Sequence, residues 1–343
     1  MKFLGLFVCA LIISCTPKAP VWELQTSHTD ASFRGISAID ENICWVSGSN
    51  GTLLKTENGG QDWKKLNTPE GADSLDFRDI EAFSSKKAIA MSAGPGKHSR
   101  LYKTDDGGNT WTHLFTNTFE KGFFTAVSFW DEENGIVLSD PVEGTHYILK
   151  TSDGGSSWSR VPRTNIPQTD SLEYGFAASG TNMRIRPGGH VWIGTGGSFA
   201  RVFYSSDYGS TWKVYPTPMK AGKASEGIFS ILFTDDKNGI AVGGNYQKQD
   251  SRKSTLIHSD DGGVTWKRNK NPLALPYQSC IAKAPNSNVL ITVGRSGSHY
   301  SSDNGLTWKT ISKKTFYTMD FGLTDQSGWA AGPKGTLAKL TFN

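Results

Sequence analysis

The side chains of this chain that could bind a ligand or carry out chemistry are charged and aromatic residues beside short apolar segments. Arginine guanidinium groups bind a carboxylate, a phosphate or an acidic protein surface through paired hydrogen bonds. Seven residues are therefore candidates for binding a ligand or partner: Arg34, Arg78, Asp140, Glu173, Arg201, Tyr246 and Arg295. The alternative interpretation is that these side chains satisfy one another and exposed carbonyl groups.

No motif supports a cofactor, a metal ion or a catalytic residue. The segment 194–199 lacks the last glycine of the dinucleotide fingerprint, and it falls between two expected strands rather than before a helix. The segment 94–97 lacks the flanking Gly and Ser/Thr of a phosphate-binding loop. The seven histidines and four cysteines form no His-x-x-x-His or Cys-x-x-Cys spacing. We therefore predict no cofactor, no metal site and no catalytic residue.

A short pattern that ends in tryptophan occurs six times and determines how the candidates are positioned. Its template is Ser/Thr-x-Asp-x-Gly-x-Thr/Ser-Trp, as in Thr104 to Trp111. The Asp side chain can accept hydrogen bonds from backbone N–H groups, and the Gly supplies a positive φ. The Trp anchors the turn by packing among apolar side chains. We call each copy a lock turn, and its structural Asp or Asn is, in chain order, Asn58, Asp106, Asp153, Asp207, Asp261 and Asp303.

The lock turns repeat at intervals typical of propeller blades. Their tryptophans are 48, 47, 54, 54 and 42 residues apart. Between them recur an apolar strand, a strand rich in Trp, Gly and Ser, and the strand that enters the lock. Counterparts of the first apolar strand, 33–39, begin near Phe77, Phe124, Phe176, Ile228, Ser279 and Tyr317. The sequence thus predicts an all-β fold, a seven-bladed β-propeller of four-stranded blades, as one domain over residues 21–343.

The seventh unit has no lock and only three expected strands after Tyr317. Its missing outer strand is available at the other end of the chain, where residues 21–24 match the segments that follow each lock. Trp22 precedes Trp63 by 41 residues, which is close to one repeat. We expect this segment to pair with the last blade, because closure removes the exposed sheet edges of an open array.

In such a ring the lock turns lie on one face, and the longer connections emerge on the other. The longest are residues 92–100, 140–146, 163–173, 215–226 and 245–254. Loops of variable length on a repeated scaffold are where binding normally takes place. All seven candidates would start or end strands on this rim, so the mouth of the central channel is the expected site.

The first 14 residues have the features of an export signal. Lys2 precedes an apolar stretch, 3–13, that is too short to span a bilayer. Ile12-Ile13-Ser14-Cys15 resembles the bacterial lipobox, which implies a lipid on Cys15 and a tether over 15–20. Thr16 after the Cys favours the outer membrane of a Gram-negative envelope. The alternative is an ordinary signal peptide that contains a cysteine.

The net charge of +4 is small, and Lys and Arg form no runs. Phosphate backbones are bound through a basic footprint, so we expect no nucleic acid partner. The expected partner is a protein or a glycan, bound by a monomer that is attached to the membrane through Cys15.

The lock turns resemble Asp boxes. From about residue 20 to 343 the chain resembles the secreted bacterial Asp-box (BNR-repeat) seven-bladed propeller lipoproteins, a group that includes the photosystem II assembly and stability factor family. Stretches 176–181, 194–197 and 329–333 also resemble those of such lipoproteins, which are often labelled oxidoreductase or glycosyl hydrolase by transfer. The resemblance implies a binding or assembly scaffold, in which an arginine patch on the propeller is important.

The alternative function is a carbohydrate-active hydrolase of the Asp-box class. Sialidases of this class carry Phe/Tyr-Arg-Ile-Pro on an early inner strand, whereas residues 33–36 here read Phe-Arg-Gly-Ile. Sialidases have six blades, and Phe77-Arg78 repeats Phe33-Arg34 one unit later. Two carboxylates facing each other about 5–10 Å apart across the mouth would favour the hydrolase. Arginines without opposed acids would favour the scaffold, which we consider the better interpretation.

Overall fold

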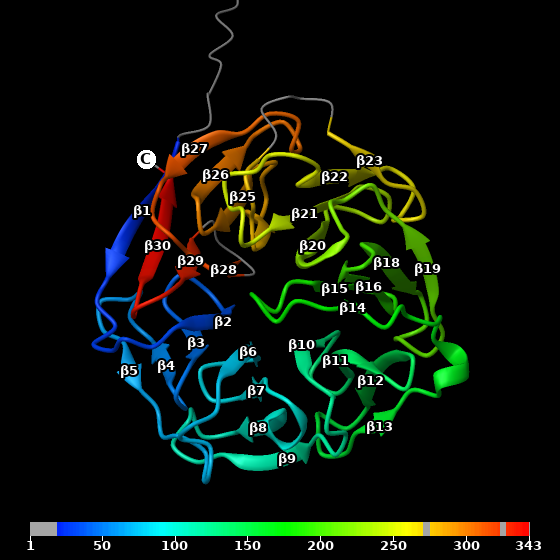
Figure 1. Cartoon of the computed structure of the whole chain (residues 1–343). Coiled ribbons are helices and arrows are strands. Elements are labelled where there is room, and N and C mark those ends of the chain that lie inside the picture. The colour runs from blue at the N-terminus through cyan, green and yellow to red at the C-terminus, as the bar shows by residue number, and fades with distance from the viewer. Residues whose placement is uncertain (1–18, 270–274, 323–326, 343) are drawn as a thin grey trace, which may run out of the picture.

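The computed structural model describes residues 19–269, 275–322 and 327–342. Seven antiparallel sheets are arranged radially around a central axis (Figure 1). This confirms the expected all-β, seven-bladed propeller. Within the described ranges no helix combines the length and the apolar character needed to cross a bilayer.

Blades 1 to 4 contain four strands each, ordered outward from the axis. Blade 1 has β2 (Phe33–Ala38), β3 (Cys44–Gly48), β4 (Leu53–Thr56) and β5 (Lys64–Lys65). Blade 2 has β6 (Phe77–Ala82), β7 (Ala88–Ser92), β8 (Arg100–Thr104) and β9 (Thr112–Thr116). Blade 3 has β10 (Phe124–Phe129), β11 (Gly135–Val142), β12 (Thr145–Thr151) and β13 (Ser159–Arg160). Blade 4 has β15 (Met183–Arg186), β16 (His190–Gly194), β18 (Arg201–Ser205) and β19 (Lys213–Pro216).

Blade 5 is a six-stranded sheet because two short strands join its inner edge. Its order is β14 (Glu173–Tyr174), β17 (Gly196–Gly197), β20 (Lys223–Phe233), β21 (Gly239–Asn245), β22 (Leu256–Ser259) and β23 (Lys267–Arg268). Blade 6 has β24 (Cys280–Lys283), β25 (Leu290–Gly294), β26 (Gly297–Ser301) and β27 (Lys309–Ser312). Blade 7 has β28 (Thr318–Phe321), β29 (Gly328–Ala331), β30 (Leu337–Phe342) and β1 (Pro20–Gln25). Two single-turn 3-10 helices, η1 (Gly96–His98) and η2 (Arg163–Asn165), lie in connections.

The ring closes through the N-terminal strand, as expected. β1 pairs antiparallel with β30 from Pro20 opposite Phe342 to Gln25 opposite Leu337. The two strands lie side by side at the blue and red ends of the chain (Figure 1). The indole N–H of Trp22 donates to Ser298 Oγ at 2.8 Å, so the strand also contacts blade 6. The last sheet therefore has no open outer edge at β30.

The hydrophobic core lies between neighbouring blades. Second strands such as β7 are buried along their whole length, which suits apolar runs packed on both faces. Three tryptophans on second strands are almost fully buried, and each donates its indole N–H to a carbonyl of the next blade. These bonds are Trp45 to Ser84, Trp192 to Gly262 and Trp329 to Asp40, at 3.1, 2.8 and 3.3 Å. The tryptophans thus join three pairs of adjacent blades by hydrogen bonds within the core.

The lock turns are held by side-chain hydrogen bonds to the backbone. In blade 3, Thr151 Oγ1 accepts the N–H of Gly155 at 2.9 Å and donates to Asp153 Oδ1 at 2.7 Å. Asp153 in turn accepts two hydrogen bonds from Ser157, one from its N–H to Oδ1 at 2.9 Å and one from its hydroxyl to Oδ2 at 2.6 Å. The hydroxyl of Ser157 and then its N–H lower the pKa of Asp153 to about 2, because both bonds stabilise the carboxylate.

We expect Asp153→Ala to lower the melting temperature by a few degrees, because the Ser157 hydroxyl and N–H lose their acceptor. The folded pKa lies below the unfolded value near 3.8, so this stabilisation is complete above about pH 4 and is lost as pH falls through 2. Differential scanning calorimetry at pH 6 and at pH 2 would measure it. Ser152→Ala is the matched control, since Ser152 is exposed in the same turn. Equal melting temperatures for the two variants at pH 6 would contradict this role.

One expected inner strand is wrong. Blade 4 was expected to begin near Phe176, but its inner strand β15 begins at Met183. Residues 175–182, which we call the crossing segment, instead pass near the centre of the ring (Figure 1). A Cβ at Gly180, where φ is +73°, would lie 2.3 Å from Asp79 Oδ1, so only glycine permits this approach. The apolar pattern at Phe176 therefore serves contacts with other blades rather than strand pairing.

Candidate functional site

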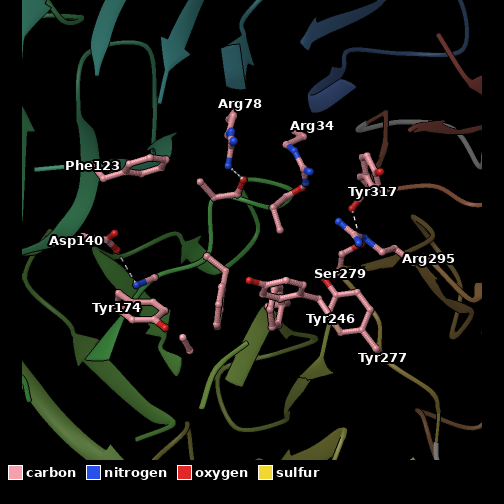
Figure 2. A pocket seen from close by; sticks show the side chains of 16 residues that line it. Arg34, Arg78, Phe123, Asp140, Tyr174, Tyr246, Tyr277, Ser279, Arg295 and Tyr317 are labelled. Carbon is pink, nitrogen blue, oxygen red and sulfur yellow. Dashed lines mark hydrogen bonds between the residues drawn. The ribbon is translucent and has the colours of Figure 1, made fainter. Parts of the chain in front are cut away.

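A cavity of about 400 Å³ opens where the inner strands begin. The lock turns follow the third strands, so the cavity lies on the face opposite the locks, where the longer connections emerge. We call it the mouth pocket. Its charged and aromatic lining residues are Arg34, Arg78, Arg295, Asp140, Phe123, Tyr174, Phe176, Phe229, Tyr246, Tyr277 and Tyr317, most of which Figure 2 labels.

A repeated β-bulge turns side chains into this pocket. The pairing of inner and second strands shifts register at Arg34 in blade 1, at Arg78 in blade 2 and at Phe229 in blade 5. A bulge adds one residue that has no partner in the ladder and redirects its side chain. These three bulge residues line the mouth pocket, whereas the corresponding bulge residue of blade 3, Thr125, does not. The same local irregularity therefore brings two arginines and an aromatic ring to one opening.

The three arginines of the pocket have few strong partners. Arg34 donates to the Ala178 carbonyl at 3.4 Å and lies 4.4 Å from the ring centre of Tyr317. Burial, and then the neighbouring Arg78 cation, lower the pKa of Arg34 from its usual range. Arg295 lies 5.7 Å from the same tyrosine ring. Within the described part of the chain, neither Arg34 nor Arg295 forms an ion pair.

Arg78 is partly satisfied. Its Nε donates to Asp76 Oδ2 at 2.7 Å, and its Nη1 donates to the Ala177 carbonyl at 3.4 Å. The carbonyl groups of Ala178 and Ala177 thus form only weak hydrogen bonds with Arg34 and Arg78, because both distances lie at the outer limit for a hydrogen bond. An anionic group entering the pocket would offer stronger, charge-assisted bonds.

Asp140 is the one carboxylate among the described residues that line the pocket. It accepts the N–H of Gly175 at 3.0 Å, and burial raises its pKa to about 7. It therefore holds the start of the crossing segment. Two opposed carboxylates, as in most glycosidases, do not line the described pocket. The described pocket thus combines three arginines with a single carboxylate.

Glu173 and Arg201 do not line the pocket but pair with each other. Arg201 Nε donates to Glu173 Oε1 at 2.9 Å, and Arg201 Nη2 forms a second, very short bond to Oε2. The Thr195 hydroxyl also donates to Oε1 at 2.7 Å. The Glu173 side chain has no exposed surface. Glu173 and Arg201 thus satisfy each other beside the pocket, while Arg34, Arg78, Asp140, Tyr246 and Arg295 come together in its lining.

Most of the aromatic residues that line the pocket were not among the candidates predicted from the sequence. Phe123, Tyr277 and Tyr317 lie within three residues of the start of an inner strand, so aromatic residues at that offset were an available signal. Tyr174 and the crossing segment offered no such signal, because their position depends on long-range contacts. Among these, Ser179 Oγ donates to the Ser279 carbonyl at 2.8 Å, and Thr318 Oγ1 donates to the Ser179 carbonyl at 3.2 Å.

No protein-family model matches the chain. It is 26% identical over 271 residues to the photosystem II assembly protein Ycf48 of Synechococcus sp. (strain JA-2-3B'a(2-13)), an alignment that covers 68% of this chain and 73% of that protein. It is 23% identical over 302 residues to the photosystem II assembly lipoprotein Ycf48 of Synechococcus sp. (strain CC9902), covering 76% and 82%. The solved structure of YCF48 bound to D1 peptide shares the fold, with a TM-score of 0.67, 20% identity and coverage of 94% and 97%. The expected resemblance to the photosystem II assembly factors is thus confirmed.

Proposed function

We propose that this propeller is a lipid-anchored extracytoplasmic scaffold that binds a protein partner through the mouth pocket and has no chemistry of its own. The observation that carries the proposal is a cavity surrounded by three arginines, two of which have no ion-pair partner in the described chain. The relatives support it, since those similar in sequence are named assembly proteins and one structure of the same fold holds a peptide.

The pocket is suited to a partner segment that carries an anionic group and otherwise has apolar side chains, which can pack on aromatic rings. A partner carboxylate could replace the Ala177 and Ala178 carbonyls as acceptor for Arg78 and Arg34. The half-buried rings of Tyr246 and Tyr317 offer flat contact surfaces that lose little conformational entropy on binding. Binding of one carboxylate would therefore be accompanied by packing of the neighbouring side chains.

The chain is attached, in this proposal, to the outer membrane through Cys15 as a monomer. Residues 1–14 would be removed as a signal, and 15–20 would form the tether to the propeller over 21–343. The signal and residues 15–18 of the tether lie outside the described residues. One relative is named a lipoprotein, which supports an acylated cysteine. The mass of the mature N-terminal peptide would distinguish acylated Cys15 from an unmodified residue.

We expect the triple substitution of Arg34, Arg78 and Arg295 to Ala to weaken partner binding at least about tenfold, because charge-assisted contacts are lost. The melting temperature should stay within a few degrees of the wild type. The partner is first identified by affinity purification from the native membranes, and its binding segment is then titrated calorimetrically against each variant.

A matched control removes the same charge away from the pocket. Arg163, Arg186 and Arg268 bond to Glu143, Asp236 and the Pro218 carbonyl respectively. Their substitution to Ala should leave affinity for the partner segment unchanged. If the pocket variant unfolds yet binds normally after refolding, the three pocket arginines are structural and the proposal is wrong.

A further inference from the structure

Positive charge is concentrated in five connections on the pocket face. These are 217–226, 245–255, 294–297, 312–317 and 331–336. Together they contain nine Lys or Arg and two Asp or Glu, a net charge of +7. The whole chain carries +4, so everything outside these connections sums to −3. Because the basic residues occur singly or in pairs along the chain, no basic run appears in the sequence.

Hydrogen bonds hold these connections next to one another. The Lys220 N–H donates to the Ser254 carbonyl at 3.0 Å and joins 217–226 to 245–255. Ser296 Oγ donates to Asp250 Oδ1 at 3.3 Å and joins 245–255 to 294–297. Thr315 Oγ1 donates to the Arg295 carbonyl at 2.9 Å and joins 294–297 to 312–317. The Tyr317 N–H donates to the Ala331 carbonyl at 2.8 Å and so adds the fifth connection. The five connections therefore form one continuous rim over blades 5 to 7.

Six lysines of this rim are exposed and form no ion pair within the described chain. We call them the lysine rim: Lys223, Lys248, Lys253, Lys313, Lys314 and Lys334. The rim is continuous with the mouth pocket, because Arg295 and Tyr246 line the pocket and belong to two of the same connections. A chain that places a carboxylate among the pocket arginines can therefore extend across the rim.

We propose that the lysine rim binds an acidic segment of the partner protein, next to the group that enters the mouth pocket. This rests on the proposed function and specifies its partner. Exposed ammonium groups on flexible stems are strongly screened, so each adds little to affinity. Together, the positive charges of the six lysines raise the rate at which an oppositely charged segment reaches the pocket. The arginines then hold the segment, and the lysines speed its arrival.

The mouth pocket favours a protein over an anionic membrane as the partner. The rim leads into a cavity of about 400 Å³ that is lined by three arginines and several aromatic rings. A carboxylate of a protein segment can enter such a concave site, whereas the surface of a bilayer cannot.

The test measures binding rates of an acidic probe by stopped-flow fluorescence. The probe is a fluorescein-labelled peptide of alternating glutamate and serine with a free C-terminal carboxylate. The rim variant changes Lys248, Lys253, Lys313 and Lys314 to Gln in the full chain. The matched control changes four exposed lysines beside or facing the lock turns, namely Lys64, Lys65, Lys237 and Lys309, to Gln. All chains also carry Cys15→Ser, so that no acyl chain is present.

We expect the rim variant to bind the probe about tenfold more slowly at low salt, with a flatter dependence of the rate on ionic strength. Its dissociation rate and its melting temperature should change little, and the control should match the wild type. The Arg34, Arg78 and Arg295 variant should instead dissociate faster. A rim effect without a pocket effect would support the rim and reject the proposed pocket function.

Three results would overturn the proposal. One is unchanged association of the rim variant, and another is an equal loss in the lock-face control. The third comes from two competitors measured with the same chains, phosphatidylglycerol vesicles and a short single-stranded DNA. If either binds the wild type more tightly than the peptide and loses that binding in the rim variant, the rim recognises lipid or nucleic acid instead.

Discussion

Deletion of residues 16–26 is expected to lower the melting temperature by on the order of 10 °C and to cause aggregation. The deletion removes β1, which forms six register pairs with β30 and supplies the outer strand of blade 7. Without it β30 becomes an open edge, which can pair with another molecule. The loss also reaches blades 6 and 1, since Trp22 donates to Ser298 and Gln25 accepts the indole N–H of Trp63 at 2.9 Å.

Single substitutions in β1 separate strand closure from side-chain packing. Trp22 packs against Phe316 with ring centres 4.9 Å apart, so Trp22→Ala should cost about 3 kcal/mol while keeping the strand. Leu24 is 61% exposed, so Leu24→Ser should change little. Calorimetry and light scattering during heating would compare the three proteins. A deletion protein that melts like the wild type, without scattering, would show that closure is unnecessary.

The blade count and the ring closure were predictable because they depend on local chemistry repeated at a fixed period. Each lock turn needs a hydroxyl, an Asp or Asn, a glycine and a tryptophan within eight residues, and all are visible in the sequence. Trp22 could be placed for the same reason, since one repeat separates it from Trp63. Signals of this kind need no knowledge of distant contacts.

The crossing segment could not be predicted, because its sequence has the apolar start of an inner strand. Phe176 stacks on Phe229, with ring centres 3.8 Å apart, and the Thr181 carbonyl accepts the N–H of Ile231. These partners come from blade 5, and no local pattern distinguishes them from strand neighbours. The lysine rim was hidden for a related reason. Its charges come from connections that are far apart in the sequence and meet only in the folded ring.

The candidate residues illustrate the same limit at the level of single side chains. Asp140 and Glu173 are both acids near the ends of strands, and the sequence treats them alike. In the structure Asp140 lines the mouth pocket and bonds to Gly175, whereas Glu173 is enclosed with Arg201. The difference arises from β14 and β17, two-residue strands too short to be recognised from a pattern.

The ion pair between Glu173 and Arg201 provides the second large expected effect. Arg201→Ala should cost about 3–5 kcal/mol of folding free energy, because it leaves the Glu173 carboxylate buried without its counter-charge. The side chain of Glu173 is 0% exposed and that of Arg201 only 23%. The comparable change at a half-exposed pair, Arg163→Ala next to Glu143, should cost well under 1 kcal/mol. Chemical denaturation of both variants would give the two free energies.

A double variant tests whether the uncompensated charge is the cause. Glu173→Gln combined with Arg201→Ala should be more stable than Arg201→Ala alone, because the buried group is then neutral and still accepts the Thr195 hydroxyl. Affinity for the partner segment should be unchanged in the folded fraction of each variant, since the pair lies outside the mouth pocket. Full stability of Arg201→Ala together with lost binding would reverse this assignment. Arg201 would then contribute to recognition, as its sequence position suggests, and Glu173 would orient it towards the partner.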